Sequence, residues 1–140
     1  NATMRNLIKK RAEEGMPIYA ECGGLMYLTK SISFAKRKYK MVGLFDAETQ
    51  MTKKMTLNYT EGRINSRCLV SAPAKFRAHE FHYSKIRNLP RDAKLVYDLK
   101  IGEGIANKKD ALSEYNTLAS YCHLYFDSAK YATKLVSKRV

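Results

Sequence analysis

The sequence has no long hydrophobic run and no paired cysteines. No stretch of 18 apolar residues occurs in its 140 residues, and no secretory signal pattern opens the chain, so neither a membrane-spanning helix nor an export signal is expected. Its three cysteines are an odd number without close-paired spacing. This argues against a disulfide framework and for a reducing compartment. We therefore expect a soluble, cytoplasmic protein.

Acidic residues are half as numerous as basic ones. Thirteen Asp and Glu stand against 26 Lys and Arg, which gives a formal net charge of +13. A polyanionic partner would suit such a surface. The basic clusters are scattered over the whole length, however, without interleaved aromatic residues, and lysine-rich surfaces are often only solvated. The pattern therefore disfavours nucleic-acid binding and leaves another polyanion, or plain solubility, as its explanation.

No repeat, low-complexity linker or internal boundary divides the chain. Residues 1–140 are therefore expected to form one domain, with an apolar fraction of 45% to supply a core. A helical pattern opens the chain at Asn1, runs to Glu14 and stops at Gly15. Position 1 is not methionine, and together with this abrupt helical start it predicts the later part of a longer protein.

Helix and strand patterns alternate along the rest of the chain, which predicts an α/β fold. A strand before residue 22 and a helix after it are followed by a short buried strand at 41–45. Alternating apolar residues predict half-exposed strands around 55–59, 75–83 and 95–99, with polar turns at 61–63 and 88–92. Residues 116–126 end the sheet, and Ser128 begins a final amphipathic helix.

Residues 18–27 (IYAECGGLMY) combine a β-favouring run, an abrupt turn and an apolar helical start, with Cys22 on the turn. Such an elbow holds a nucleophile above the edge of a sheet, and the positive end of the next helix favours thiolate over thiol. Gly23 and Gly24 relieve crowding behind the turn, and the Gly23 amide is placed to stabilise an oxyanion. The alternative is that Cys22 is simply a small buried residue.

A cysteine nucleophile needs a base, and the chain offers His79, His82 and His123. In a regular strand His79 and His82 point to opposite faces, so they cannot serve the same site. His123 follows an apolar run near the carboxyl end of an expected strand, where active sites gather in open α/β sheets. It is therefore the candidate base for Cys22, and a structural role is the alternative for each histidine.

A metal site is a further alternative for these side chains. It would combine Cys68 with His79 and His82, or Cys122 with His123. Neither spacing matches a usual zinc pattern, and adjacent cysteine and histidine side chains do not easily close on one ion. We therefore expect no metal.

Three segments together resemble the cobyrinate a,c-diamide synthase family in order and spacing: residues 18–28 (IYAECGGLMYL), 77–84 (RAHEFHYS) and 118–126 (LASYCHLYF). The resemblance implies the later part of an open-sheet α/β domain like the class I glutamine amidotransferases. It implies no cofactor within these residues. ATP and Mg²⁺ would serve an amino-terminal domain of the parent chain, which activates the a and c acetate carboxylates of the tetrapyrrole. That domain and the first strands of the amidotransferase domain, with a glycine-rich loop, are absent here.

The same resemblance implies roles for individual residues. Cys22 matches the family nucleophile, and His123, 101 positions later, matches the histidine that raises its nucleophilicity. The family has no glutamate two residues past the histidine, and Tyr125 stands there. His79 and Glu80 become candidates for positioning glutamine, although such a strand also serves for domain contacts. The sequence departs from most members at Tyr125 and Ala78, and neither departure touches the pair.

The expected function is therefore the glutaminase part of an ATP-dependent cobyrinate a,c-diamide synthase in cobalamin biosynthesis. Its partners would be glutamine, a polycarboxylate tetrapyrrole and the amino-terminal ATP-binding domain. Two alternatives remain at this point. The same signatures occur in the enzyme that amidates nickel-sirohydrochlorin, and the chain is alternatively a non-catalytic module whose basic surface binds a polyanion. Intact Cys22 and His123 argue against the non-catalytic alternative.

Overall fold

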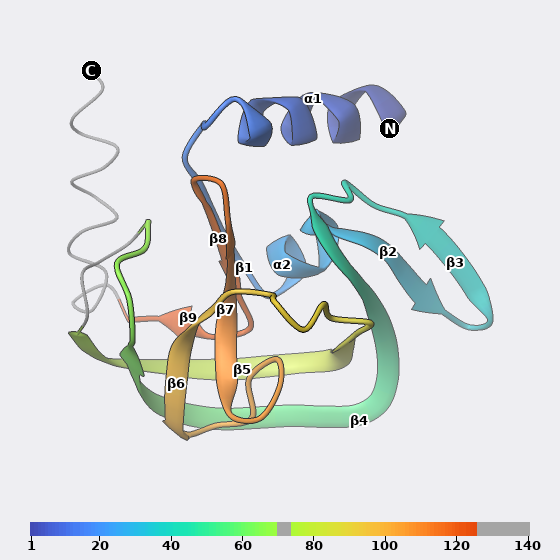
Figure 1. Ribbon diagram of the computed structural model, residues 1–140. Helices are drawn as coiled ribbons and strands as arrows, with labels where there is room; N and C mark the ends of the chain where they lie inside the picture. The colour runs from blue at the N-terminus through green and yellow to red at the C-terminus, as the bar shows by residue number, and fades with distance from the viewer. Residues whose placement is uncertain (70–73, 126–140) are drawn as a thin grey trace.

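A computed structural model describes residues 1–69 and 74–125 (Figure 1). The described part contains two helices and a nine-stranded mixed sheet. The elements are α1 (Ala2–Glu13), β1 (Ile18–Glu21), α2 (Gly23–Leu28), β2 (Thr29–Phe34), β3 (Arg37–Lys40), β4 (Phe45–Ile64), β5 (Ala74–Arg87), β6 (Leu95–Ile101), β7 (Lys109–Glu114), β8 (Thr117–Ser120) and β9 (His123–Leu124).

The sheet is open and mixed, which confirms the predicted α/β class. Its strand order is β1-β8-β7-β6-β4-β2-β3, and β5 lies off this path, paired with β4 and β9. The β1–β8 and β2–β4 pairs are parallel and the other pairs are antiparallel. In Figure 1 the long β4 and β5 ribbons run side by side below β1 and β8, and α1 lies at the top of the view.

The helix predicted at the start of the chain is confirmed. The Asn1 side chain caps α1 by accepting the backbone N–H of Met4 at 3.0 Å, as an Ncap residue does. Gly15 ends the helix with φ of +87°, a conformation that glycine adopts without steric cost. Ala12 is the fully buried residue of this helix and packs in the core beside Leu25 and Leu28 of α2.

The strand predicted at residues 41–45 is wrong for its first four positions. Gly43 has a φ of +69°, which a strand does not accommodate. The N–H groups of residues 41–44 instead bond to carbonyl oxygens of residues 27–30, and the long strand β4 starts only at Phe45. The hairpin formed by β2 and β3 was not predicted; Ala35 and Lys36 both adopt positive φ at its turn.

The polar turn predicted at residues 61–63 is also wrong, because β4 continues through it. Gly62 pairs with Phe76 of β5 on one side and Leu99 of β6 on the other. A Cβ added at Gly62 would lie 2.6 Å from the Asp98 carbonyl oxygen and 2.9 Å from the Phe76 ring. This glycine therefore marks a close approach between strands rather than a turn. The turn predicted at 88–92 is confirmed by a positive φ at Asn88.

The strands predicted around 55–59, 75–83 and 95–99 are confirmed as parts of β4, β5 and β6. On β4, however, the apolar side chains Leu57 and Tyr59 are exposed, whereas Thr56 and Thr60 are buried. Strand β7, which was not predicted, carries the fully buried Asp110. The final helix predicted from Ser128 lies outside the described residues.

Candidate active site

The elbow predicted around Cys22 is present between β1 and α2. Cys22 has φ of 47° and ψ of −102°, which lies outside the regions that L-residues ordinarily adopt. Two hydrogen bonds hold it there: its N–H donates to the Ser120 carbonyl at 2.8 Å, and its own carbonyl accepts the Met26 N–H at 3.1 Å. Backbone strain of this kind persists only where the surroundings enforce it, and it is concentrated at functional sites.

The two glycines after Cys22 differ in what they permit. A Cβ at Gly24 would lie 2.9 Å from the Cβ of Ala20, so glycine at this position lets α2 approach β1 closely. A Cβ at Gly23 would meet nothing within 4 Å. Crowding behind the turn is therefore relieved by Gly24 alone, and Gly23 is notable for its backbone N–H, which hydrogen-bonds to the Cys22 sulfur.

The surroundings of the Cys22 side chain favour the thiol over the thiolate. Its S–H donates to the Phe81 carbonyl oxygen at 3.4 Å. Burial raises the pKa of the Cys22 thiol, the hydrogen bond from Gly23 lowers it, and the negative charge of Glu21 raises it further. The effect of the Gly23 amide at the start of α2 is in the expected direction, toward thiolate, but burial has the larger effect on this pKa. A base that accepts the thiol proton would therefore help to form the nucleophile.

His123 begins its own short strand, β9, rather than following the end of the preceding one. Strand β8 ends at Ser120, and His123 then pairs in register with His79 of β5. The two imidazole rings stack with centroids 4.7 Å apart and planes 6° from parallel. His123 is partly exposed. The β5 strand thus fixes the position and ring plane of the predicted base.

Strand β5 brings Cys22 and His123 to the same part of the sheet. The Phe81 carbonyl contacts the Cys22 sulfur, and His79, two residues earlier on the same strand, stacks on His123. A direct link also exists, because Oε2 of Glu21 lies 3.3 Å from Nδ1 of His123. The residue before the predicted nucleophile therefore contacts the predicted base, and Glu21 is a site residue that the sequence reasoning missed.

His79 and His82 lie on opposite faces of β5, as their parity predicted. His79 is exposed beside His123, whereas His82 is buried and stacks on Tyr121 with ring centroids 3.7 Å apart. Nδ1 of His82 lies 3.0 Å from the Ser84 carbonyl oxygen. Burial lowers the pKa of His82, so it is neutral near pH 7. His79 therefore borders the site, and His82 supports it from within the core.

Glu80 faces the interior and is fully buried. Its carboxylate accepts the backbone N–H groups of Glu103 at 3.0 Å and Gly104 at 2.7 Å, and the Asn58 side-chain amide at 3.3 Å. Three donors thus surround a carboxylate that would be costly to bury alone. Glu80 holds the loop between β6 and β7 against β5, and its role in positioning glutamine stays a prediction.

Glu80 belongs to a buried cluster with Asp110 and Cys122. Among the described residues, this is the group of acidic, histidine or cysteine side chains that brings three possible metal-ligand atoms within 4.8 Å of one another. Cys68, His79 and His82, considered together from the sequence, do not form such a group within the described residues. Asp110 accepts the N–H groups of Tyr121 and Cys122 at 3.1 and 2.8 Å. Burial raises the pKa of Asp110 to about 6, against the opposing effect of these hydrogen bonds. Backbone donors occupy both carboxylates, so the cluster fits a structural role better than a metal.

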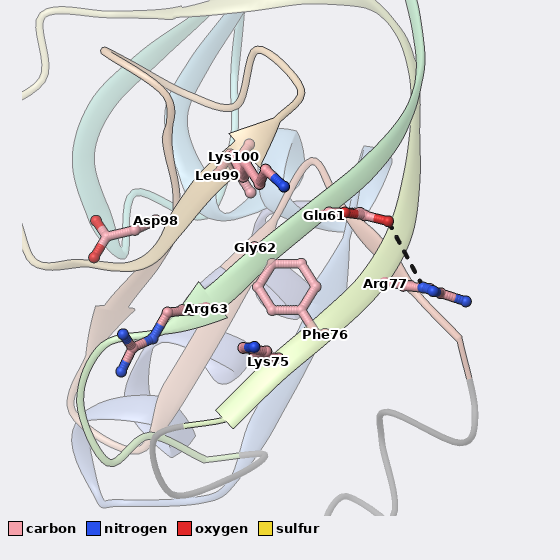
Figure 2. Close-up of a pocket in the computed structure, with 9 residues that line it drawn as sticks. All are labelled: Glu61, Gly62, Arg63, Lys75, Phe76, Arg77, Asp98, Leu99 and Lys100. Carbon is pink, nitrogen blue, oxygen red and sulfur yellow. Dashed lines mark ion pairs between the residues drawn. The ribbon is translucent and has the colours of Figure 1, made fainter.

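A basic groove, lined by Glu61, Gly62, Arg63, Lys75, Phe76, Arg77, Asp98, Leu99 and Lys100, lies across β4, β5 and β6. Its cavity volume is about 650 Å³. Figure 2 shows the Phe76 ring beside Gly62 at its centre, and Arg77 in an ion pair with Glu61 at 3.8 Å. Four cationic side chains against two acidic ones give it a positive balance. No residue of the Cys22 elbow lines this groove.

The chain matches a family model described as the CobB/CobQ-like glutamine amidotransferase domain over residues 1–131. It is 48% identical over 124 residues to the cobyrinate a,c-diamide synthase of Sulfurisphaera tokodaii and 42% identical over 139 residues to that of Methanosarcina barkeri. These matches cover 88% and 89% of this chain but 28% of each relative. The chain therefore spans little more than a quarter of the length of these proteins.

Two solved structures share the fold. One is a glutamine amidotransferase with a TM-score of 0.62 and 13% identity, over 96% of this chain and 66% of that one. The other is a glutamine amidotransferase of Thermotoga maritima with a TM-score of 0.58 and 16% identity, over 99% and 56%. The open-sheet fold predicted by resemblance is thus confirmed. No helix within residues 1–69 and 74–125 has the length and apolar character needed to cross a membrane.

Proposed function

Because the chain belongs to the CobB/CobQ-like glutamine amidotransferase domain family, we propose that it is the glutaminase part of a cobyrinate a,c-diamide synthase. The observation that carries the proposal is that the strained elbow at Cys22 and the imidazole of His123 both contact the same strand, β5, the first through the Phe81 carbonyl and the second through the His79 ring. A thiol whose pKa burial raises becomes a nucleophile when a neighbouring base accepts its proton.

The proposed reaction proceeds in two stages. His123 accepts the Cys22 thiol proton as the sulfur attacks the side-chain carbonyl carbon of glutamine, and the Gly23 N–H donates to the oxyanion that forms. His123 then returns the proton to the leaving nitrogen, so that ammonia and a glutamyl thioester result. In the second stage His123 takes a proton from water, which attacks the thioester. Glutamate leaves, and the proton returns to the Cys22 sulfur.

The rest of the parent chain would use the ammonia. In this proposal an amino-terminal domain binds ATP and Mg²⁺, activates carboxylates of a polycarboxylate tetrapyrrole and amidates them, in the cytoplasm. The names of the relatives support cobyrinate as that acceptor. In this proposal ATP and Mg²⁺ bind to that domain. The clustered carboxylates described here, those of Glu80 and Asp110, already accept hydrogen bonds from the backbone. The basic groove is suited to acceptor carboxylates through Arg63, Lys75 and Lys100.

The proposal is tested in the full-length protein by glutaminase activity and by labelling with an electrophilic glutamine analogue. Cys22→Ser and His123→Ala are expected to reduce glutamine hydrolysis by roughly a thousand-fold or more, because each removes one partner of the nucleophile–base pair. The analogue should label Cys22, and free glutamine should protect it.

The matched controls are Cys68→Ser and Cys122→Ser, which are expected to retain most of the activity. Cys122 is fully buried, whereas Cys22 is partly exposed, so the analogue should not reach the Cys122 sulfur. Equal labelling of all three cysteines, or an active Cys22→Ser protein, would refute the proposed function.

A further inference from the structure

Glu21 is the carboxylate that the structure brings to His123. Its Oε2 lies 3.3 Å from Nδ1 of His123. Its Oε1 accepts the backbone N–H of Leu124 at 3.0 Å and the phenol of Tyr19 at 2.5 Å. The two carboxylate oxygens therefore have different partners. Oε2 contacts the imidazole ring, and Oε1 accepts hydrogen bonds from the backbone of β9 and the side chain of Tyr19.

The position two residues after His123 supplies no carboxylate. Two residues past His123 stands Tyr125, an exposed phenol whose backbone N–H bonds to the Arg77 carbonyl at 3.3 Å. Among the described residues, Glu21 is the acidic side chain within 4 Å of the His123 ring nitrogens. The carboxylate next to His123 is thus the last residue of β1, directly before Cys22.

We propose that Glu21 is a positioning residue for the reaction, completing a Cys22–His123–Glu21 arrangement; this rests on the proposed function. A carboxylate only accepts hydrogen bonds. A negative charge 3.3 Å from Nδ1 favours the tautomer of neutral His123 that carries its proton on Nδ1, which leaves Nε2 to accept the thiol proton of Cys22. The same negative charge stabilises the imidazolium that forms during the transfer, as the acid does in other nucleophile–histidine–acid triads.

Because the two oxygens of Glu21 have different partners, Glu21→Gln tests directly whether Glu21 sets the tautomer of His123. Leu124 N–H and the Tyr19 phenol both need an acceptor, so the glutamine oxygen is expected to take the place of Oε1. Its NH₂ group then faces His123 and donates to Nδ1. This forces the proton onto Nε2, the nitrogen that must accept from Cys22. Glu21→Ala leaves both tautomers accessible and is therefore the milder change.

The experiment uses the full-length protein and measures kcat and KM for glutamine hydrolysis. Glu21→Gln should lower kcat by roughly 100- to 10,000-fold with little change in KM, and Glu21→Ala should lower it less. Glu13→Gln is the matched control, since it makes the same chemical change at an exposed ion pair on α1 with Lys9, and it should retain wild-type kinetics. A purely structural role for Glu21 predicts the opposite order, with the larger deletion causing the larger loss.

The tautomer gives a second readout that does not depend on activity. Nitrogen NMR of ¹⁵N-histidine-labelled protein, with the signals assigned through His123→Ala, should show Nδ1 protonated in the wild type and Nε2 protonated in Glu21→Gln. An unchanged tautomer, or an order of kcat in which Glu21→Gln exceeds Glu21→Ala, would overturn this inference even if Cys22→Ser is inactive. If Cys22→Ser is active, the proposed function fails, and the tautomer still decides whether Glu21 holds His123.

Discussion

The backbone conformation of Cys22 costs free energy for any L-residue, whether or not the side chain carries sulfur. At φ of 47° and ψ of −102°, the Cβ of any L-residue is crowded, whereas glycine has no Cβ. Local strain of this kind typically costs about 1–3 kcal/mol. The chain thus retains at this position a residue whose conformation disfavours folding, and the proposed role of Cys22 as the nucleophile would account for it.

The strain leads to a prediction that separates stability from activity. Cys22→Gly should raise the free energy of unfolding by about 1 kcal/mol, since relief of strain exceeds the extra freedom of glycine in the unfolded chain, and it should abolish glutamine hydrolysis. Equilibrium unfolding in denaturant measures the first effect. Cys22→Ala is the control, because it removes the sulfur and keeps the Cβ, and should gain no such stability. Equal stability of the Gly and Ala variants would argue against strain at the elbow.

The long strands β4 and β5 depend on a close approach at one glycine. Gly62 lies between Phe76 and the Asp98 carbonyl, where no room exists for a methyl group. A local pattern of glycine between charged residues predicts a turn, and here it is overruled by pairing on both sides of β4. The same packing sets the floor of the basic groove.

Gly62→Ala should therefore lower the free energy of unfolding by about 1–3 kcal/mol, the usual cost of forcing extra volume into a packed site. The measurement is again equilibrium unfolding. Gly23→Ala serves as the comparison, since the added methyl at Gly23 meets nothing within 4 Å and should leave stability unchanged or slightly higher. A Gly62→Ala protein as stable as the wild type would mean that β4 and β6 separate here at little cost.

Across the whole molecule, one sheet face is unusually apolar for an exposed surface. Leu57 is 60% exposed and Tyr59 81% exposed on β4, and Phe81 is 48% exposed on β5. Phe81 also supplies the carbonyl that contacts the Cys22 sulfur. Contiguous apolar side chains of this kind mark interaction surfaces. If the proposed function holds, the amino-terminal domain is expected to cover this face and to receive ammonia near it.

Charged substitutions on this face should uncouple glutamine hydrolysis from amidation of the acceptor. In the full-length protein, Leu57→Lys and Tyr59→Lys together should lower the amount of amidated product per glutamine hydrolysed by several-fold, because ammonia escapes from an interface that no longer closes. Folding should change little, since exposed positions usually shift stability by within about 0.5 kcal/mol. Tyr115→Lys, at an exposed tyrosine between β7 and β8, is the control. An unchanged ratio in the double variant would place the domain contact elsewhere.

The sequence by itself determined the features that depend on neighbouring residues. The capped first helix, the strand–turn–helix elbow at Cys22, the opposite faces of His79 and His82, and the alternating strands all follow from local conformation and side-chain periodicity. The family signatures added the predicted pairing of Cys22 with His123, which stays a prediction. Glu21 was visible beside Cys22, but its contact with His123 was not, because 102 positions separate them and only strand pairing brings them together.

Tertiary structure decided what depends on distant partners. It made Gly62 a packing glycine rather than a turn, turned Thr56 and Thr60 inward on β4 and left Leu57 and Tyr59 exposed, and gave Glu80 a buried role in holding a loop. It also raised the pKa of the Cys22 thiol, since burial has a larger effect than the opposing hydrogen bond from Gly23. Register, burial and desolvation arise from the whole sheet, so no short window of sequence contains them.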